Sequence, residues 1–443
     1  MAKQFIQYQD MIAKLYPELA KAENPQLENK DKTLSRTVTF QVTDDCNLAC
    51  KYCYQINKGK RRMSLETAKK FVDLLLTGDK GMEDYLHPEN SPALIIEFIG
   101  GEPFLEIELI DQICDYIFDK MLELDHKWLT KHTFSICSNG VLYFDSRVQR
   151  FLNKHKNHLS FSVTIDGNKE LHDSCRVFHD GRPSYDLAVA AAKDWMDHGH
   201  YMGSKITIAP GNVDYLYDAI IHMIDMGYDE INANTVYEKG WDIDLAQRYY
   251  YQLIRIADYL VDNDLTEKIY ISLFSEEFFM PKLEIENENW CGGCGLMLSC
   301  DPDGNLYPCI RYMESSLGAY REPYCIGNVN DGIGVTPEEI RKINCLNCIT
   351  RRSQSTDECF YCPIGSGCSW CSAYNYQETG TPNERVTYSC DMHKARSLAN
   401  VYLWNKHYKK IGIDKKFKMY CPKEWALKII SEDEYNKLLE LSE

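Results

Sequence analysis

The sequence predicts an α/β fold, with a partial (β/α)6 barrel followed by a loop-rich C-terminal region. Short apolar runs alternate with helix-like stretches, and strands separated by helices form parallel βα units with right-handed crossovers. There are six such units, whereas a closed barrel of this kind needs eight, so the barrel is expected to be open. The C-terminal region is indicated by cysteine: 12 of the 19 cysteines lie between Cys291 and Cys390.

The expected barrel elements follow one another along the first half of the chain. Ser64 is a suitable N-cap for the first helix, because its hydroxyl can accept from an unpaired backbone N–H. Strands are expected at 37–42, 93–99, 133–137, 159–165, 205–209 and 230–235. Helices are expected at 65–76, 104–124, 147–154, 185–198 and 215–226.

The remaining segments are assigned from apolar spacing and composition. At the N-terminus, residues 4–20 carry one apolar helical face, and residues 21–35 are polar. After the barrel, an amphipathic helix is expected at 241–264 and a connector at 265–285. Further helices are expected at 393–410 and 431–441. The cysteine-rich region shows little helical or strand periodicity, so bound metal rather than a large core is expected to organise it. The expected domains are an N-terminal helical extension (1–35), the barrel (36–240), a linker helix and connector (241–287), the cysteine-rich domain (288–395) and a C-terminal helical segment (396–443).

Composition narrows the classes of function. The chain has 443 residues and a net charge of −17, and an acidic surface makes nucleic acid a poor default partner. No run of about 18 apolar residues is present, and the first residues lack the apolar stretch of a signal peptide, so no membrane association and a cytoplasmic location are expected. Cytoplasmic thiols are kept reduced, so clustered cysteines indicate metal or iron–sulfur binding rather than disulfides.

Cys46, Cys50 and Cys53 form a C-x3-C-x2-C motif directly after the first expected strand. Three thiolates can hold three irons of a [4Fe–4S] cube and leave the fourth iron open for chemistry. The alternatives are a zinc site or three unliganded core thiols. A structural zinc prefers four protein ligands, and no fourth cysteine or histidine lies nearby in the sequence. The exit of a barrel strand also favours a catalytic role.

The segment DDCNLACKYCYQ around this motif resembles the signature of the radical S-adenosylmethionine (SAM) superfamily. The resemblance implies that the amino and carboxylate groups of SAM chelate the open iron. Reduction would split SAM into methionine and a 5′-deoxyadenosyl radical that abstracts hydrogen. Tyr52, before the third cysteine, would lie against the adenine.

Further motifs follow successive strand exits in the order that this superfamily shows. Gly100-Gly101-Glu102-Pro103 resembles its GGEP motif, in which Glu102 would accept from the SAM ammonium. His172-Asp173 and Arg176 resemble HDxxR, in which Arg176 would meet the SAM carboxylate. The other expected SAM-contacting positions are Ser138 and Asn139 of an SNG motif, Ser162, Asp166 and Thr207, with Asn212 near the fifth strand.

The cysteine-rich region resembles the SPASM domain, which carries two auxiliary iron–sulfur clusters, although one spacing is x2 where the family has x3. Structural zinc is the alternative for CxxC pairs. The resemblance implies one cluster on Cys294, Cys309 and Cys371, completed by Cys291 or Cys300, and a second on Cys359, Cys362, Cys368 and Cys390. The expected cofactors are therefore SAM and three [4Fe–4S] clusters, one that binds SAM and two auxiliary ones. Cys345 and Cys348 match no position of the pattern, and buried thiols without a metal role are expected at Cys114, Cys137, Cys175, Cys325 and Cys421.

The resemblance extends to radical SAM maturases of ribosomally made, cysteine-containing precursor peptides. It implies an anaerobic enzyme that forms an intramolecular crosslink, with a thioether favoured, and whose partners are a precursor with its leader and a ferredoxin- or flavodoxin-type electron donor. Alternatives are a carbon–carbon crosslink, epimerisation, formylglycine formation, or a non-catalytic iron–sulfur peptide-binding protein. Formylglycine formation is disfavoured, because sulfatase maturases have an Asp after the G-x4-C cysteine and this chain has Ile310.

Overall fold

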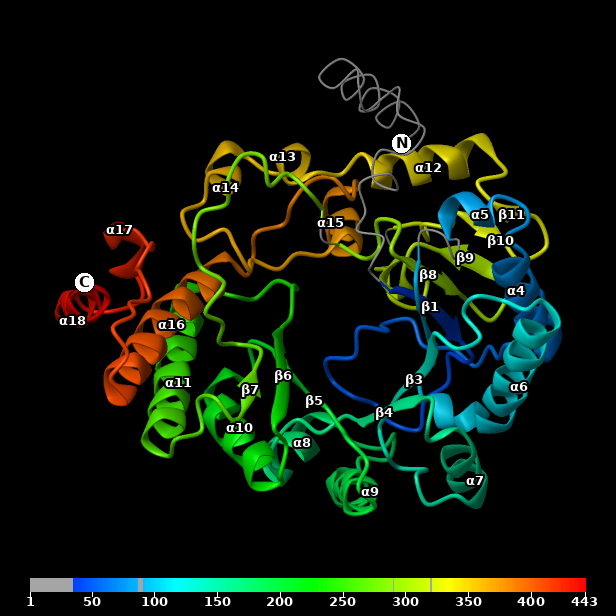
Figure 1. Ribbon diagram of the computed structural model, residues 1–443, viewed down its shortest axis with the longest axis horizontal. Coiled ribbons are helices and arrows are strands. Elements are labelled where there is room, and N and C mark those ends of the chain that lie inside the picture. The colour runs from blue at the N-terminus through cyan, green and yellow to red at the C-terminus, as the bar shows by residue number, and fades with distance from the viewer. Residues whose placement is uncertain (1–34, 87–90, 290, 319–320) are drawn as a thin grey trace.

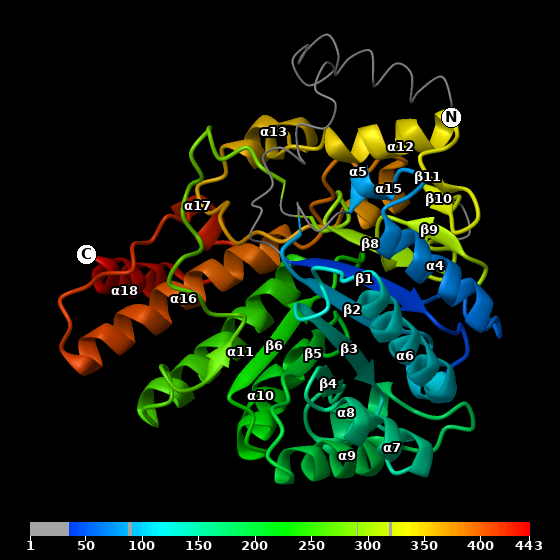
Figure 2. The same cartoon turned by 45° about the vertical axis from the view of Figure 1, so that its right-hand side comes forward.

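The computed structural model describes residues 35–86, 91–289, 291–318 and 321–443. Its parallel strands form an open rather than a closed barrel, as the sequence predicts (Figures 1 and 2). All six expected strands are present, each within a few residues of its expected bounds. They are β1 (Arg36–Gln41), β2 (Leu94–Ile99), β3 (His132–Ser138), β4 (Leu159–Val163), β5 (Ser204–Ile208) and β6 (Glu230–Thr235).

The parallel strands are divided between two sheets. Strands β1 to β4 pair in chain order, and β5 pairs with β6, whereas no pairing joins β4 to β5 within the described residues. A short strand that the sequence pattern did not indicate, β7 (Tyr270–Ile271), extends the second sheet beside β6. Because all these pairings are parallel, the carboxyl ends of neighbouring strands lie at the same edge of each sheet.

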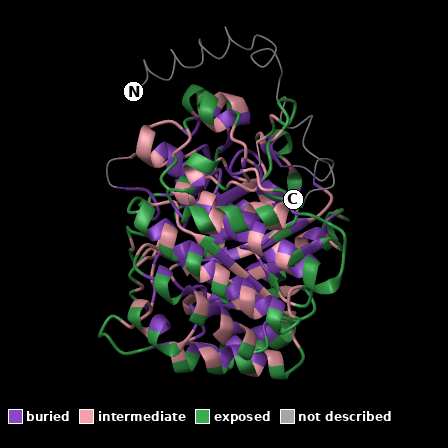
Figure 3. Ribbon diagram, turned by 90° about the vertical axis from the view of Figure 1, so that its left-hand side faces the viewer, coloured by how far each residue is buried: buried purple, intermediate pink, exposed green. Residues whose placement is uncertain are grey.

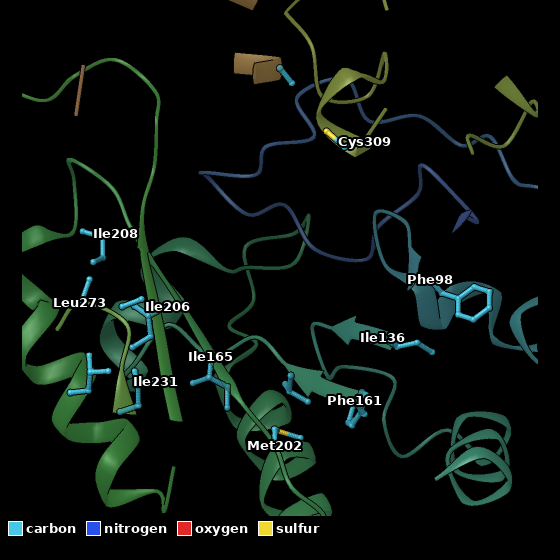
Figure 4. Close-up of a cluster of buried hydrophobic side chains, with 14 of the residues drawn as sticks. Phe98, Ile136, Phe161, Ile165, Met202, Ile206, Ile208, Ile231, Leu273 and Cys309 are labelled. Atoms are coloured by element: carbon cyan, nitrogen blue, oxygen red, sulfur yellow. The ribbon is translucent and has the colours of Figure 1, made fainter. Parts of the chain in front are cut away.

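The strands present an apolar face to the helices and a polar face to the barrel interior. Phe98, Ile136 and Phe161 are neighbours across β2, β3 and β4 and are all buried (Figure 4). One residue earlier, the same register aligns Glu97, Ser135 and Ser160, none of which is buried. Side chains of a strand alternate between its two faces, so the barrel has an apolar outer face and a polar interior.

The helices between the strands cover the outer face. Ser64 caps the first one by accepting from the backbone N–H of Thr67 at 3.0 Å, which confirms the expected start. A short helix that the sequence pattern did not indicate, α8, follows β4. The barrel helices are α4 (Leu65–Thr77), α5 (Met82–Tyr85), α6 (Ile107–Glu123), α7 (Ser146–His155), α8 (Lys169–Cys175), α9 (Tyr185–Asp197) and α10 (Leu216–Asp225).

The cysteine-rich region contains more regular structure than its composition indicates. Strand β8 (Met297–Cys300) pairs parallel to β1, with Thr37 opposite Met297, so this region continues the barrel sheet (Figure 2). Three short antiparallel strands then extend the sheet: β9 (Asn305–Tyr307), β10 (Gly327–Asn328) and β11 (Gly332–Ile333). The helices of the region are α12 (Pro337–Asn347), α13 (Arg351–Gln354), α14 (Asp357–Phe360) and α15 (Ser372–Thr379). β-pairing to the barrel therefore contributes to the order of this region, and the organising role of bound metal stays a prediction.

Two long helices connect the barrel to the C-terminal segment. Helix α11 (Ile243–Asp262) packs against α16 (Cys390–Ile411), and α17 (Lys423–Ala426) and α18 (Glu432–Ser442) also pack against α16. Figure 3 shows buried and exposed residues alternating along the helices on this face of the molecule. Helix α16 runs across the expected boundary at 395/396.

The predicted helix at 4–20 lies outside the described residues. In the part of the chain that is described, none of the helices combines the length and apolarity that a membrane span requires.

Candidate functional site

The expected site residues gather at one edge of the first sheet. The three-cysteine loop follows β1, the GGEP segment follows β2, Ser138 ends β3 and Asp166 follows β4. Since these four strands are parallel neighbours, their carboxyl ends bring the segments together, although they lie far apart in the chain.

The loop with Cys46, Cys50 and Cys53 is held by the segment after α8. The backbone N–H of Ala49 donates to Val177 at 2.8 Å, and that of Lys51 donates to Cys175 at 3.0 Å. Cys46 is buried, and Cys50 and Cys53 are half-buried. Burial raises the pKa of the Cys46 thiol to about 11, so metal binding at this thiol would release a proton.

Arg176, Asp166 and Tyr52 form a connected group beside this loop. The Nε of Arg176 donates to Asp166 Oδ2 at 2.7 Å, the Tyr52 hydroxyl donates to the same oxygen, and Nη1 lies 3.8 Å from the sulfur of Cys50. The guanidinium also lies over the Tyr52 ring, 5.3 Å from its centroid. Asp166 is fully buried, yet its Oδ1 has no hydrogen-bond partner among the described residues. A buried acceptor of this kind suits a polar ligand that donates a hydrogen bond, as SAM can.

The first two residues of the HDxxR motif hold this group in place. His172 is buried, its Nδ1 accepts from the backbone N–H of Asp166, and its Nε2 contacts the Ser184 hydroxyl at 3.0 Å. Burial lowers the pKa of His172 to about 4, so the ring is neutral at physiological pH. Asp173 accepts from the backbone N–H of Ser184 at 3.0 Å, which fixes the loop that returns from α8. The motif therefore acts locally as a brace for Arg176.

Glu102 links the exits of β2 and β3. One of its oxygens accepts from the Ser138 hydroxyl at 2.7 Å and from the backbone N–H of Phe104 at 3.1 Å, and the other accepts from the N–H of Asn139 at 2.9 Å. The side chain is 1% exposed, and this burial raises its pKa. A carboxylate offers about four acceptor positions, so one remains for an ammonium group of a ligand.

Pro103 begins the short 3-10 helix at Pro103–Glu106, directly after Glu102. Ser162 and Thr207 lie lower in the barrel, within β4 and β5. Both are half-buried. Ser162 lines a cavity of about 580 Å³ at the junction of the two sheets, whose wall also includes Ser160, Lys205, Glu230 and Asn232. The structure therefore brings Ser138, Asn139 and Asp166 to the cysteine loop, whereas Ser162 faces the polar barrel interior.

The glycines of the GGEP segment are required by the chain itself. A Cβ atom on Gly101 would lie 2.3 Å from the backbone oxygen of Asp45 and 2.7 Å from Cβ of Cys46. A Cβ atom on Gly100 would lie 2.9 Å from the backbone oxygen of Thr43. Backbone atoms of the cysteine loop cannot yield as a flexible side chain can, so these two segments pack closely only because both residues lack a side chain.

We expect Gly101→Ala to displace the cysteine loop and to reduce the iron held there after anaerobic reconstitution. Iron and sulfide content per chain is the measurement. Gly203→Ala is the matched control, because its nearest neighbour would be the Tyr201 hydroxyl at 3.7 Å, an ordinary contact. Equal iron content in Gly101→Ala and wild type would contradict the expected close packing.

The thiols of the described residues do not form a ready-made mononuclear zinc site. In a tetrahedral site with Zn–S bonds of about 2.3 Å, neighbouring sulfurs lie about 3.8 Å apart. Within the described residues, the single group of three metal-ligating atoms that all lie within 4.8 Å of one another is Asp111, Asp115 and His155, and it contains no cysteine. A donor set made of sulfurs fits iron–sulfur chemistry.

A first group of cysteines gathers above the barrel, which we call the Cys309 group: Cys291, Cys294, Cys309 and Cys371. The thiol of Cys294 donates a hydrogen bond to Cys291 and lowers the pKa of Cys291. Burial raises the pKa of Cys309, and the charge of Cys371 raises it further. A Cβ on Gly293 would lie 3.3 Å from the sulfur of Cys309, so this thiol packs against the Cys291–Cys294 turn. Figure 4 shows Cys309 on the loop after β9, apart from the apolar residues of the sheets.

Cys300 is separate from the Cys309 group. It lies on β8, is fully buried opposite Phe40 of β1, and its electrostatic neighbours are Asp301 and Cys325. Of the two candidates for the fourth thiol, the structure therefore brings Cys291 to the group and leaves Cys300 in the sheet. Cys345, on α12, is buried and hydrogen-bonded to Tyr324.

A second group lies at the start of α16, which we call the Cys368 group: Cys359, Cys362, Cys368 and Cys390. Burial raises the pKa of Cys362 and of Cys368, and the nearby thiols raise it further. Arg385 lies among these thiols, and its Nη2 donates to the sulfur and to the backbone oxygen of Cys368, both at 3.1 Å.

Sequence reasoning missed three charged residues next to the thiols. Arg385 contacts the Cys368 group, and Arg311 lies beside the Cys309 group and pairs with Glu238 at 2.8 Å. The sequence offered a weak signal for Arg311 alone, which follows Cys309 by two residues. The other two come from loops after β6 and α15, and only the fold brings them to the cysteines.

Comparison with known proteins agrees with this geometry. Residues 35–185 match the family model of a 4Fe-4S single cluster domain. The chain is 22% identical over 360 residues to the radical SAM cyclopropyl synthase TigE of Paramaledivibacter caminithermalis, covering 75% of this chain and 67% of that protein. It is 24% identical over 310 residues to the serine-type anaerobic sulfatase-maturating enzyme of Bacteroides thetaiotaomicron, covering 62% and 69%.

The fold resembles that of anSMEcpe, solved with bound AdoMet and the Kp18Cys peptide, with a TM-score of 0.61 and 17% identity over 85% of this chain and 99% of that one. Residues 35–185 thus resemble a 4Fe-4S single cluster domain, and the chain is similar to radical SAM enzymes in sequence and to anSMEcpe in fold.

Proposed function

We propose that this enzyme is a peptide maturase that removes hydrogen from a ribosomally made, cysteine-containing precursor and forms an intramolecular thioether. The observation that carries the proposal is the arrangement of two thiol sets at the mouth of the barrel. Cys53 is followed by Tyr54, Arg311 lies over the Tyr54 ring, and the charge of Cys371 acts on Arg311. The side chains of Tyr54 and Arg311 thus link the three-cysteine loop to the Cys309 group. A peptide bound at the mouth of the barrel would lie near both.

The relatives support a macromolecular substrate. A sulfatase-maturating enzyme acts on a protein, and the structure of anSMEcpe contains a bound peptide. The polar barrel interior, which includes Glu97 and Ser162, suits a hydrogen-bonding substrate better than an apolar one.

We assign the cofactor positions as follows. Cys46, Cys50 and Cys53 would hold a [4Fe–4S] cluster with one open iron, and Tyr52, Glu102, Asp166 and Arg176 would bind SAM beside it. The Cys309 group and the Cys368 group would each hold a further cluster, with four thiols apiece. Four thiols would occupy all four irons of a cube. A cluster in the Cys309 group would therefore have no open iron for a substrate thiolate.

When bound, SAM supplies by reductive cleavage the radical that abstracts a hydrogen atom. Thioether formation breaks one C–H and one S–H bond of the precursor and makes one C–S bond. The hydrogen atom would leave in deoxyadenosine, the thiol proton would pass to solvent, and an auxiliary cluster held by one of the cysteine groups would take the remaining electron. An external donor of the ferredoxin or flavodoxin type would return electrons to the cluster at the three-cysteine loop.

The test is anaerobic reconstitution with SAM, a reductant and a synthetic precursor that contains repeated cysteines. We expect deoxyadenosine and a peptide lighter by two hydrogens for each link, with one cysteine per link no longer open to alkylation. A product of unchanged mass would favour epimerisation. A mass loss with every cysteine still open to alkylation would favour a carbon–carbon crosslink.

Formylglycine formation is disfavoured by the residues around Cys309. Ile310 follows Cys309 and begins a short 3-10 helix at Ile310–Tyr312, so no carboxylate stands at that position. Asp301 is buried, and its carboxylate accepts from the backbone N–H groups of Asp303 and Asn305 at 3.0 and 2.9 Å. The Asp301 carboxylate therefore stabilises the turn in which it lies and is not oriented as a base.

The Arg311–Glu238 pair is a candidate contact to the precursor. Glu238 is 44% exposed, so the pair can open toward a bound peptide. We expect Arg311→Gln to raise the KM for the precursor about 10- to 100-fold, the size of a lost charged hydrogen bond. SAM cleavage measured without peptide should stay unchanged. Steady-state kinetics with and without precursor separate the two effects.

A neighbouring ion pair provides a matched control for this variant. Lys239 pairs with Glu378 at 2.7 Å and likewise joins the barrel to the cysteine-rich region, with the Lys239 side chain 66% exposed and that of Glu378 7% exposed. Lys239→Gln should change the KM little, because Glu378 keeps the hydrogen bond that it accepts from the Tyr388 hydroxyl at 3.1 Å. Equal KM values in both variants would mean that Arg311 and Glu238 only join the two regions.

A further inference from the structure

Arg385 belongs to the loop between α15 and α16, and two backbone contacts fix its position. Its own N–H donates to the backbone oxygen of Gln354 at 2.9 Å, and the next N–H, of Val386, donates to Asn375 Oδ1 at 2.9 Å. Asn375 is 1% exposed, so this acceptor is itself held by packing. The guanidinium is therefore preorganised before any metal binds.

The guanidinium points at one ligand sulfur and acts on all four. Nη2 lies 3.1 Å from the sulfur of Cys368 and 3.1 Å from its backbone oxygen. The charges of Cys368, Cys359, Cys390 and Cys362 each favour the protonated guanidinium, in that order. Arg385 thus contacts Cys368 directly and lies within electrostatic reach of the other three thiols.

Two other cations near these thiols, Arg396 and Lys394, have partners of their own. Arg396 donates to the backbone oxygens of Leu273 and Ser272 at 2.8 and 2.6 Å. Lys394 pairs with Asp391 at 2.8 Å, so the two charges beside Cys390 largely offset each other. Arg385, in contrast, donates a hydrogen bond to a thiol sulfur of this group.

A fixed cation has a definite effect on a cluster with four thiolate ligands. Such a cluster becomes more negative on reduction, and its potential depends on net charge and on hydrogen bonds to its sulfurs. A guanidinium that donates to one of these sulfurs stabilises the reduced form more than the oxidised form. It therefore raises the reduction potential and makes the cluster a better electron acceptor.

We propose that Arg385, through its charge and its hydrogen bond to Cys368, raises the reduction potential of the auxiliary cluster in the Cys368 group. This cluster would then accept the electron left after crosslinking. This inference rests on the proposed function, because it requires a cluster on these four thiols. It adds a specific residue that controls where the surplus electron goes.

The test is a redox titration of the full-length, anaerobically reconstituted protein, monitored by electron paramagnetic resonance. The signal of this cluster is identified by its loss in Cys359→Ala. In Arg385→Gln, which keeps a donor but removes the charge, we expect the oxidised-to-reduced ratio at a fixed potential to rise at least about tenfold, a shift of 59 mV toward negative values for one electron. Arg385→Lys keeps the charge without the planar fork and should shift in the same direction by less.

Arg352→Gln is the matched control, because Arg352 lies on the neighbouring α13 and pairs with Asp357 at 2.7 Å. Its potential should equal that of wild type. An Arg385→Gln protein with full iron content and an unchanged potential would overturn the inference. If that variant loses iron, Arg385→Lys decides the question, and an unchanged potential there overturns the inference equally. Wild-type protein without a cluster that depends on Cys359 would instead overturn the proposed cluster assignment.

Discussion

Replacing Cys46, Cys50 and Cys53 together by alanine is expected to abolish SAM cleavage completely. These thiols are the proposed sulfur ligands on the loop after β1, and that loop meets Arg176 and Asp166 at the mouth of the barrel. Without them no iron would remain to which SAM could bind. Formation of deoxyadenosine under anaerobic, reducing conditions should fall below detection, whether or not a precursor is present.

The same variant should retain the iron of the other two thiol groups. With three clusters in the wild type, iron content should fall by about one third and not to zero. Cys300→Ala is the matched control, because Cys300 is buried in β8 away from the Cys309 group, and its replacement should leave the iron content unchanged. Deoxyadenosine production by the triple variant would disprove the assignment of the site. Loss of iron in Cys300→Ala would make Cys300 a ligand after all.

The second large effect is expected from Glu102→Gln. Glu102 accepts three hydrogen bonds inside the protein, from the Ser138 hydroxyl and from the backbone N–H groups of Phe104 and Asn139. A glutamine has a single acceptor oxygen, and its NH2 group would face at least one of these donors. A hydrogen bond to a charged group contributes about 1.5–3 kcal/mol, so SAM affinity should fall at least about 10-fold, together with thermal stability.

Equilibrium binding of SAM to the cluster-loaded protein and the thermal midpoint are the two measurements for Glu102→Gln. Glu106→Gln serves as the control for SAM binding, because Glu106 lies in the same segment but pairs with Arg62 at 2.8 Å, with the Glu106 side chain 14% exposed and that of Arg62 55% exposed. Its replacement should change SAM affinity little. If Glu102→Gln binds SAM like wild type and loses only stability, Glu102 merely links the exits of β2 and β3.

The first half of the molecule was predictable because its signals are local. Each of the six strands and five helices expected in the barrel carries its own apolar period, and the eight-residue cysteine motif follows β1 closely. Parallel βα units then bring successive strand exits to one edge without any further information. Ser64 is an example at the level of one residue: its hydroxyl caps α4 through a contact three residues away.

The remaining features were decided by contacts between distant parts of the chain. β8 pairs with β1, so Thr37 lies opposite Met297, and no local period indicates such a partner. That pairing also holds Cys300 inside the sheet, so Cys300 belongs to neither thiol group. Cys291 lies on the preceding turn and belongs to the Cys309 group.

By itself the sequence thus determined the open α/β barrel, the three-cysteine loop and the class of chemistry. Only the tertiary structure decided which thiols form a group and which arginine reaches each group. Arg176, Arg311 and Arg385 come from three unrelated loops, and each lies beside a different set of cysteines. The physical reason is that spacing along the chain encodes the geometry of a turn, whereas the approach of a charge to a sulfur depends on how separate loops pack.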